Sequence, residues 1–263
     1  MIKGKTHSAF SAEGKSGQGM VMNNKAEPPH RDGLSRRIFL RASFFFAFLA
    51  SLPSSAWAFF ISRFPARTVE EETFHFDPLS GLIRRKGGKA NEPYFLTIDG
   101  LVEEKMKWSY SDLLSLPQVH QTSDFHCVEG WSVRDVRWTG IRFEEIVKKV
   151  KPKREAAYAV FHAPGQTSTK PGGWNHYVES LPLEALLDKE KECLLALLMD
   201  GKPLSDSHGA PLRLVSPHDL GYKSIKYVNR IEFTRKRQPG WWTLANPIYP
   251  WDAPVPPGRL RKR

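Results

Sequence analysis

Cysteine is scarce in this chain: its 263 residues include only Cys127 and Cys193. The sequence Cys-x-x-Cys-His, which attaches haem covalently, is absent, so a reaction that needs haem would take it from a separate protein. No internal repeat is evident. With 40% hydrophobic and 12% aromatic residues, the chain can bury a sizeable core, which excludes global disorder. Two thiols leave a disulfide between them open.

Acidic residues are outnumbered, since 28 Asp and Glu against 39 Lys and Arg give a formal charge of +11. Such an excess is compatible with nucleic-acid binding. Part of it lies in residues 1–58, which hold eight basic and three acidic residues. The moderate remainder suits a domain that holds a phosphorylated ligand or meets an acidic partner. The basic cluster at the end of the chain is typical of a solvated tail; it comprises Arg259, Arg261, Lys262 and Arg263.

The apolar run near the start of the chain is short. It covers residues 42–52, about half the roughly 20 residues of a membrane span, and Pro53 ends it. Residues 35–40 (Ser-Arg-Arg-Ile-Phe-Leu) before it are typical of a twin-arginine signal, and Ala-Trp-Ala at 56–58 is a small-residue cleavage site. We therefore expect export of the folded protein to the periplasm by the twin-arginine translocase. An uncleaved anchor is the alternative, because residues 59–61 extend the apolar character.

Short strands dominate the rest of the chain. Ser109 is expected to cap a short helix that Pro117 stops, and two further helices are expected over 142–150 and from about 180 to 187. A long loop is expected over 164–173. The expected strands are 94–98, 156–162, 193–199, 212–215 and 225–233. This balance predicts an α+β fold that is mixed and β-rich, with antiparallel pairing.

The two cysteines have different surroundings. Cys127 ends a predicted strand in a polar and aromatic segment, and Gly130 follows where the backbone can approach a ligand closely. Cys193 begins a continuous apolar run and is expected to be a small buried hydrophobe. If Cys127 faces a site and Cys193 lies in the core, a disulfide between them is disfavoured.

The segment around Cys127 carries a family resemblance. Residues 125–132 (Phe-His-Cys-Val-Glu-Gly-Trp-Ser), followed by Trp-Thr-Gly at 138–140, resemble the cysteine segment of the sulfite oxidase family, and most of all the catalytic subunit of periplasmic methionine sulfoxide reductase. Further matching segments follow in the same order, at 94–102, 177–187, 200–204, 208–213 and 221–226. The resemblance implies a sulfite oxidase-type molybdopterin-binding fold.

Four regions follow from this resemblance and from the leader. We expect a twin-arginine signal peptide with a polar extension over 1–58 and an irregular amino-terminal arm over 59–90. A molybdopterin-binding catalytic domain is expected over 91–235, and a carboxy-terminal extension over 236–263.

The resemblance implies molybdenum-molybdopterin (Mo-MPT) as the cofactor, with Cys127 as the metal ligand. A soft thiolate suits an electron-poor transition metal, and the charge of the metal keeps the sulfur ionised. The cofactor phosphate requires cations, for which Arg213 offers a forked donor and Lys226 a point charge. The implied cofactor-binding residues are His162, His208, Arg213, Lys223, Ser224, Ile225 and Lys226. Tyr177 is the candidate catalytic residue that faces the metal; a core tyrosine is the alternative.

The implied reaction is a two-electron oxygen-atom transfer on a small molecule or a protein sulfoxide. The electrons would pass to a haem-containing membrane subunit or a soluble cytochrome. Sulfite oxidisers carry an arginine shortly after the metal cysteine, whereas this chain reads Glu-Gly-Trp-Ser at 129–132, so sulfite is not the favoured substrate. The Asn and Tyr-Glu cluster of the sulfoxide reductase also has no clear equivalent over 59–91.

Other functions remain open on the sequence alone. One is a hydrolase in which Cys127 is the nucleophile, beside His126, His162 or His208. Another is an exported, non-catalytic binding domain of the same fold, although Cys127 and Arg213 together argue against loss of the cofactor. The export signal argues against a nucleic-acid binder.

Overall fold

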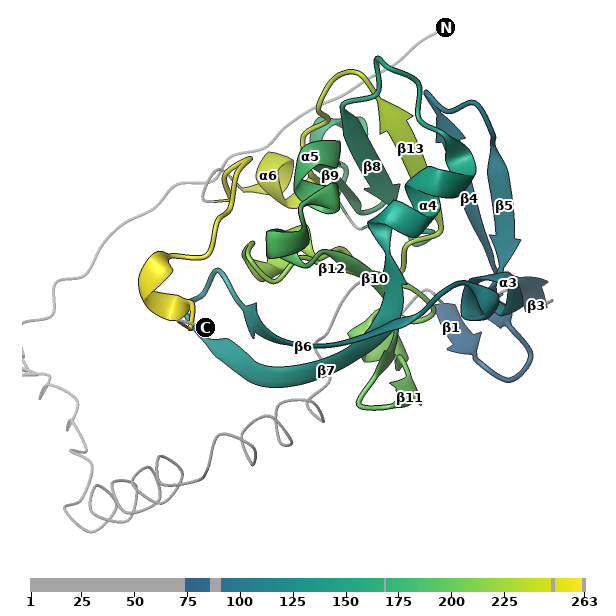
Figure 1. Ribbon diagram of the computed structural model, residues 1–263, viewed down its shortest axis with the longest axis horizontal. Coiled ribbons are helices and arrows are strands. Elements are labelled where there is room, and N and C mark those ends of the chain that lie inside the picture. The colour runs from purple at the N-terminus through teal and green to yellow at the C-terminus, as the bar shows by residue number, and fades with distance from the viewer. Residues whose placement is uncertain (1–73, 86–90, 168, 247–248, 262–263) are drawn as a thin grey trace, which may run out of the picture. The chain divides into compact units, whose positions relative to one another are not determined.

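The computed structural model describes residues 74–85, 91–167, 169–246 and 249–261. The expected signal peptide and the start of the expected arm lie outside these ranges. Within them, no helix combines the length and apolar character that crossing a membrane requires. The described elements form three β-sheets with a few short helices (Figure 1).

The first sheet is a small meander that the sequence did not predict. Strands β1 (Phe74–Asp77), β2 (Leu82–Arg85) and β3 (Asn91–Pro93) pair antiparallel in that order. Asp77 closes the β1–β2 turn by accepting hydrogen bonds from the Leu79 amide and the Ser80 hydroxyl, at 3.0 and 2.6 Å. The expectation of an irregular arm is therefore wrong for residues 74–85, because a side-chain-capped turn and alternate buried residues make a hairpin there.

The second sheet carries the cysteine segment and has the order β11-β10-β7-β6, with β12 also paired to β10. All its pairings are antiparallel. The eleven-residue strand β7 was not predicted, because its pairing with β6 and β10 depends on partners that the local sequence pattern does not specify. The strands are β6 (Val119–His126), β7 (Ser132–Arg142), β10 (Leu194–Met199), β11 (Lys202–Pro203) and β12 (Arg213–Val215).

The third sheet has the order β5-β4-β13-β8-β9 and is antiparallel except for the parallel pair of β13 with β4. The expected strand over 225–233 begins only at residue 230, because Tyr227 adopts a positive φ of 61° that interrupts an extended run. The strands are β4 (Phe95–Gly100), β5 (Met106–Ser109), β8 (Tyr158–His162), β9 (Val178–Pro182) and β13 (Arg230–Thr234).

Three helices lie close to their predicted positions, whereas the helix over 241–245 was not predicted and the helix expected from about 180 begins only at residue 183, after β9. Ser109 caps α3 (Tyr110–Ser115) with a reciprocal capping box to Asp112. In α4 (Phe143–Val150) the ring of Phe143 lies 6.0 Å from the rings of both Phe161 and Phe233, so the helix packs on the third sheet. The other helices are α5 (Leu183–Leu187) and α6 (Trp241–Ala245).

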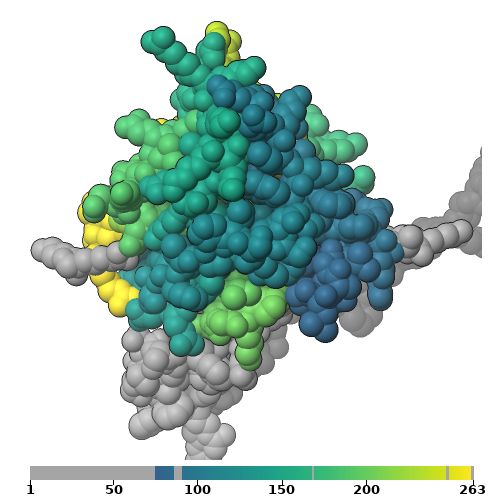
Figure 2. All heavy atoms as spheres, turned by 45° about the vertical axis from the view of Figure 1, so that its right-hand side comes forward, coloured from purple at the N-terminus to yellow at the C-terminus, as the bar shows by residue number. Residues whose placement is uncertain are grey.

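Figure 1 shows where the carboxy-terminal extension runs up to its last described turn. In Figure 1 the last 3-10 turn, η6 (Pro257–Arg259), lies beside the ends of β6 and β7. In Figure 2, residues coloured blue to teal, from the first half of the described chain, make up most of the visible face. The carboxy-terminal extension therefore returns to the hairpin that carries Cys127.

A candidate cofactor site around Cys127 and Arg213

Cys127 lies at the tip of the hairpin formed by β6 and β7. Its amide donates to the Trp131 carbonyl at 2.9 Å, and the Gly130 amide donates back to the Cys127 carbonyl at 3.2 Å. Gly130 has a φ of 97°, a conformation that glycine adopts without strain. The thiol is free and half-buried, so a tight and well-bonded turn presents a sulfur at the edge of the domain.

The surroundings of the Cys127 sulfur act on its charge in both directions. Burial raises the pKa of the thiol, and the carboxylate of Glu129 raises it further. Hydrogen bonds from the backbone amides of Glu129 and Val128 lower it. When a nearby cation stabilises the thiolate form of Cys127, these two amides can donate hydrogen bonds to its sulfur.

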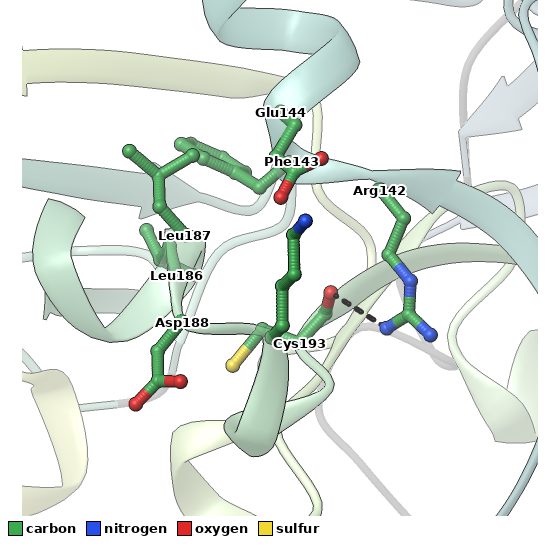
Figure 3. A pocket seen from close by; sticks show the side chains of 8 residues that line it. Arg142, Phe143, Glu144, Leu186, Leu187, Asp188 and Cys193 are labelled. Atoms are coloured by element: carbon green, nitrogen blue, oxygen red, sulfur yellow. Dashed lines mark hydrogen bonds between the residues drawn. The ribbon is translucent and has the colours of Figure 1, made fainter.

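Cys193 behaves as the sequence predicts. It is 3% exposed, its sulfur lies 3.4 Å from the Ser216 hydroxyl, and burial raises its pKa to about 11. Both cysteines are free, so no disulfide joins them. Cys193 also lines a surface cavity of about 260 Å³, in which Arg142 donates to the Cys193 carbonyl oxygen (Figure 3). Because its lining mixes acidic and basic side chains, the cavity favours no charged ligand.

Arg213 is a buried cation at the start of β12. Its guanidinium donates to the carbonyl oxygens of His208 and Ser224, at 3.0 and 3.2 Å, and burial lowers its pKa to about 10. Within the part of the chain that the structure describes, no carboxylate lies at ion-pair distance from it. A buried charge without a counterion is costly, so this position suits an anionic ligand.

One aromatic ring connects Arg213 to the cysteine hairpin. The Arg213 guanidinium lies 5.6 Å from the centre of the Phe125 ring and 5.1 Å from that of Trp138. Phe125 lies near the end of β6, two residues before Cys127, which is in the turn that follows this strand. The structure thus brings the cysteine segment and the predicted phosphate-binding arginine to one place.

Lys226 and His208 lie beside Arg213. The Lys226 ammonium donates to the Ser207 carbonyl at 2.5 Å, and its side chain packs so closely on Gly209 that a Cβ there would lie 2.7 Å from the Lys226 Cβ. Burial, with the charges of Arg213 and Lys226, lowers the pKa of His208 to about 4, so His208 is neutral. These three residues form a basic cluster in which His208 carries no charge.

The other residues predicted from 221–226 point elsewhere. The Ser224 hydroxyl accepts from the Ser216 amide at 3.0 Å, and Ile225 is buried, with its carbonyl accepting from Leu214. Lys223 forms a buried ion pair with Glu179. The charge of Lys223 is therefore compensated, whereas that of Arg213 is not.

His162 lines a second cavity, of about 350 Å³. Burial lowers its pKa to about 3, and its Nε2 is buried without a hydrogen-bond partner among the described residues. The Trp174 and His176 rings lie 5.8 and 5.3 Å from its own. The Asn229 amide donates to the His162 carbonyl, and the next residue along the chain, Val228, donates to the carbonyl of Leu212 beside Arg213.

Tyr177 lies in an aromatic cluster with the carboxy-terminal extension. Its ring lies 4.9 Å from that of Trp241 and 5.7 Å from that of Trp242. Trp242 in turn contacts Tyr249 at 5.4 Å, and the charges of Glu129 and Cys127, after burial, raise the pKa of the Tyr249 hydroxyl. Tyr249, which sequence reasoning missed, is thus the member of this cluster that the structure ties to the cysteine hairpin.

The expectation of a solvated basic tail is wrong for Arg259 and Arg261. The Arg259 guanidinium donates to the Cys127 and Trp131 carbonyls at 3.0 and 2.5 Å, and to the Ser132 hydroxyl at 3.0 Å. Arg261 pairs with Asp124 and Asp135. A run of basic residues does not disclose its partners, so no signal in the sequence identified these contacts.

Comparison with known proteins places this site in a family. Residues 86–242 match the model of the oxidoreductase molybdopterin-binding domain. The chain belongs to this family. As a member, it has the sulfite oxidase-type fold, binds molybdopterin and is a molybdenum-dependent oxidoreductase.

Two similar proteins illustrate the relationship. The uncharacterized oxidoreductase YuiH of Bacillus subtilis (strain 168) is 38% identical over 147 residues, which cover 56% of this chain and 68% of YuiH. The crystal structure of the sulfane dehydrogenase SoxCD from Paracoccus pantotrophus matches with a TM-score of 0.48 and 21% identity over 65% of this chain. The match spans 49% of that SoxCD chain, about half its length.

The described residues fit the cofactor of the family. The half-buried Cys127 thiol is a soft donor that suits a transition metal whose other ligands come from the cofactor, and Arg213 is a buried cation without a carboxylate partner among the described residues. Across the described ranges, no group of three or more His, Cys, Asp or Glu could hold a metal by protein ligands alone.

Proposed function

We propose that this molybdopterin oxidoreductase transfers an oxygen atom to or from a small molecule or a protein sulfoxide, and that Cys127 is its metal ligand. When bound, the cofactor supplies a two-electron redox centre that exchanges an oxygen atom with the substrate. The observation that carries the assignment of the residues is the contact of the Arg213 guanidinium with the Phe125 ring, because Phe125 lies only two residues before the free Cys127.

The basic cluster of His208, Arg213 and Lys226 would hold the cofactor by its phosphate. Arg213 and Lys226 supply positive charge for the phosphate. His162 and His176, neutral in their cavity, would hydrogen-bond the pterin ring. Lys223 contributes indirectly, since its pair with Glu179 fixes the loop that follows Gly221.

The surface next to Cys127 favours an uncharged substrate. Glu129 lies two residues after Cys127, and its carboxylate repels anions such as sulfite. Trp131 is 45% exposed beside it, and its indole donates to Glu129 at 3.1 Å. The exposed indole offers an apolar surface that suits a neutral molecule such as a sulfoxide. Tyr177, the candidate catalytic residue, would act here through the aromatic cluster that reaches Tyr249.

The electron partner and the location belong to the same proposal. The chain carries no Cys-x-x-Cys-His motif, so electrons would pass to a separate haem-containing membrane subunit or a soluble cytochrome. The twin-arginine motif at 35–40 supports export to the periplasm after the cofactor is inserted.

A cysteine hydrolase is disfavoured by the geometry. His126 contacts the Ser132 hydroxyl at 2.8 Å through Nδ1, and burial lowers its pKa. A nucleophilic cysteine needs a lowered pKa, whereas that of Cys127 is raised.

The decisive experiment measures molybdenum in protein produced by a molybdenum-competent host. We expect about one molybdenum per chain for the wild type, near zero for Cys127→Ser, and wild-type content for the matched control Cys193→Ser. The purified holoenzyme should reduce neutral sulfoxides when a dye is the electron donor, and it should not oxidise sulfite when a dye is the electron acceptor. A Cys127→Ser protein that keeps its molybdenum would refute the assignment of the ligand.

A further inference from the structure

The carboxy-terminal extension is attached to the hairpin of Cys127 at several points. Ala253 and Val255 are buried, and backbone hydrogen bonds join them to the loop before Gly221: Leu220 donates to the Ala253 carbonyl at 2.7 Å and Val255 to that of His218 at 2.9 Å. The chain then turns through η6 and reaches the ends of β6 and β7 (Figure 1).

Arg259 contacts the cysteine turn itself. Its Nη1 donates to the Cys127 carbonyl at 3.0 Å, and its Nη2 donates to the carbonyl of Trp131, the last residue of the turn, and to the hydroxyl of Ser132, the first residue of β7. The forked, planar donor thus joins the two sides of the turn that presents the sulfur.

Neighbouring ion pairs hold Arg259 in place. Arg134 donates to the Arg259 carbonyl at 3.2 Å and forms an ion pair with Asp124. Asp124 also forms an ion pair with Arg261. Arg261 further pairs with Asp135 across the hairpin. Because Asp124 accepts from both arginines, its pKa is lowered well below the usual range, although burial opposes the shift. These contacts form a network, which restricts the arginines more than isolated surface pairs would.

We infer that Arg259 is a positioning residue for the cofactor: it clamps the turn of Cys127, so that residues 253–261 fix the place of the metal-binding sulfur. This inference rests on the proposed role of Cys127. Arg259 acts through the backbone of the turn. A rigid turn holds the ligand in one geometry, on which the electronic properties of a bound metal depend.

The test compares Arg259→Gln with Arg85→Gln in the full chain. Arg85 is a matched control, because it also donates to a backbone carbonyl, that of Pro164 at 3.3 Å, but lies in the first sheet. Hydrogen exchange at the amides of Cys127 and Gly130 should be about tenfold faster in Arg259→Gln and unchanged in Arg85→Gln. Equal exchange at these two amides in Arg259→Gln and the wild type would overturn the inference.

Two further measurements separate positioning from a purely structural role. In the holoenzyme, Arg259→Gln should broaden the EPR signal of the half-reduced molybdenum, whereas Arg85→Gln should leave it as in the wild type. Arg259→Lys keeps the positive charge but loses the planar, forked set of donors, so it should give intermediate exchange rates. If Arg259→Gln does not fold, Arg259→Lys replaces it in the test. An EPR signal that is identical in Arg259→Gln would contradict the inference.

The inference and the proposed function can fail separately. Amide exchange reports on the turn whether or not the metal is bound, and molybdenum content in Cys127→Ser reports on the ligand alone. If Cys127→Ser retains molybdenum, the proposed function fails, and with it the link from the clamp to the metal. If only the exchange rates stay unchanged, the clamp fails and Cys127 remains the ligand.

Discussion

The ring of Phe125 occupies the space into which any side chain at Gly221 would project: a Cβ there would lie 2.2 Å from the Phe125 Cζ. The same ring faces the Arg213 guanidinium at 5.6 Å. The glycine therefore lets an aromatic ring pack between a loop and the predicted phosphate-binding arginine. Two segments of the sequence that both resemble the family meet at this contact.

Gly221→Ala should displace Phe125 and disturb the cofactor site. We expect a loss of about 1–3 kcal/mol in the free energy of unfolding, because the added methyl group overpacks the contact. The molybdenum content should fall as well. Adding Phe125→Leu, which shortens the opposing side chain, should restore part of both. Urea denaturation and metal analysis check this, and wild-type molybdenum in Gly221→Ala would show that the contact does not matter to the site.

The buried pair of Lys223 and Glu179 should behave as a unit. Lys223→Met leaves the Glu179 carboxyl buried without its cation, so we expect a loss of about 3–5 kcal/mol in the free energy of unfolding. The double variant Lys223→Met/Glu179→Leu removes both charges and should recover most of that loss. Urea denaturation of the three proteins at pH 7 measures the difference. Equal stability of the single and double variants would contradict this coupling.

Much of the fold followed from local patterns. The capping box at Ser109, the amphipathic helix over 143–150 and the apolar run after Cys193 each have a short-range cause that the sequence displays. The β1–β2 hairpin and β7 were missed because their pairing depends on partners that the local pattern does not specify. Secondary structure was thus predictable where neighbours along the chain determine it.

The candidate site divides in the same way. The proximity of Cys127 to Arg213 was expected from the resemblance, and the structure brings their segments together through Phe125. The pairing of Lys223 with Glu179 and the return of Arg259 to the cysteine turn join residues 44 and 132 positions apart. Contacts of that kind depend on the tertiary fold, so no local motif predicts them.

Gly140, which the resemblance singled out, has a structural role between β7 and β10. A Cβ there would lie 2.1 Å from the Leu195 carbonyl oxygen and 2.7 Å from the Ala196 Cα. Gly140→Ala should therefore push the two strands apart and cost about 2–3 kcal/mol of unfolding free energy. Gly258→Ala, where an added Cβ meets open space, is the control and should change stability by less than about 0.5 kcal/mol. Thermal or urea denaturation distinguishes the two, and equal stabilities would argue against a close strand approach.

His162 should make the stability of the protein depend on pH. Its pKa is lowered from 6.5 to about 3 in the folded chain, so below pH 6.5 the unfolded chain binds a proton that the folded chain does not. The free energy of unfolding should therefore fall as the pH falls from about 6.5 towards 3, with a limiting slope near 1.4 kcal/mol per pH unit from this residue. Above pH 6.5 both states are neutral and the contribution is constant.

The variant His162→Gln isolates this contribution, because glutamine is polar and of similar length but does not titrate in this range. Urea denaturation of both proteins at pH 7, 6 and 5 should give a shallower decline for the variant, and the two curves should differ in slope only below about pH 6.5. Parallel curves for the wild type and His162→Gln would mean that His162 takes up its proton in the folded state, and that its cavity is more polar than the buried Nε2 indicates.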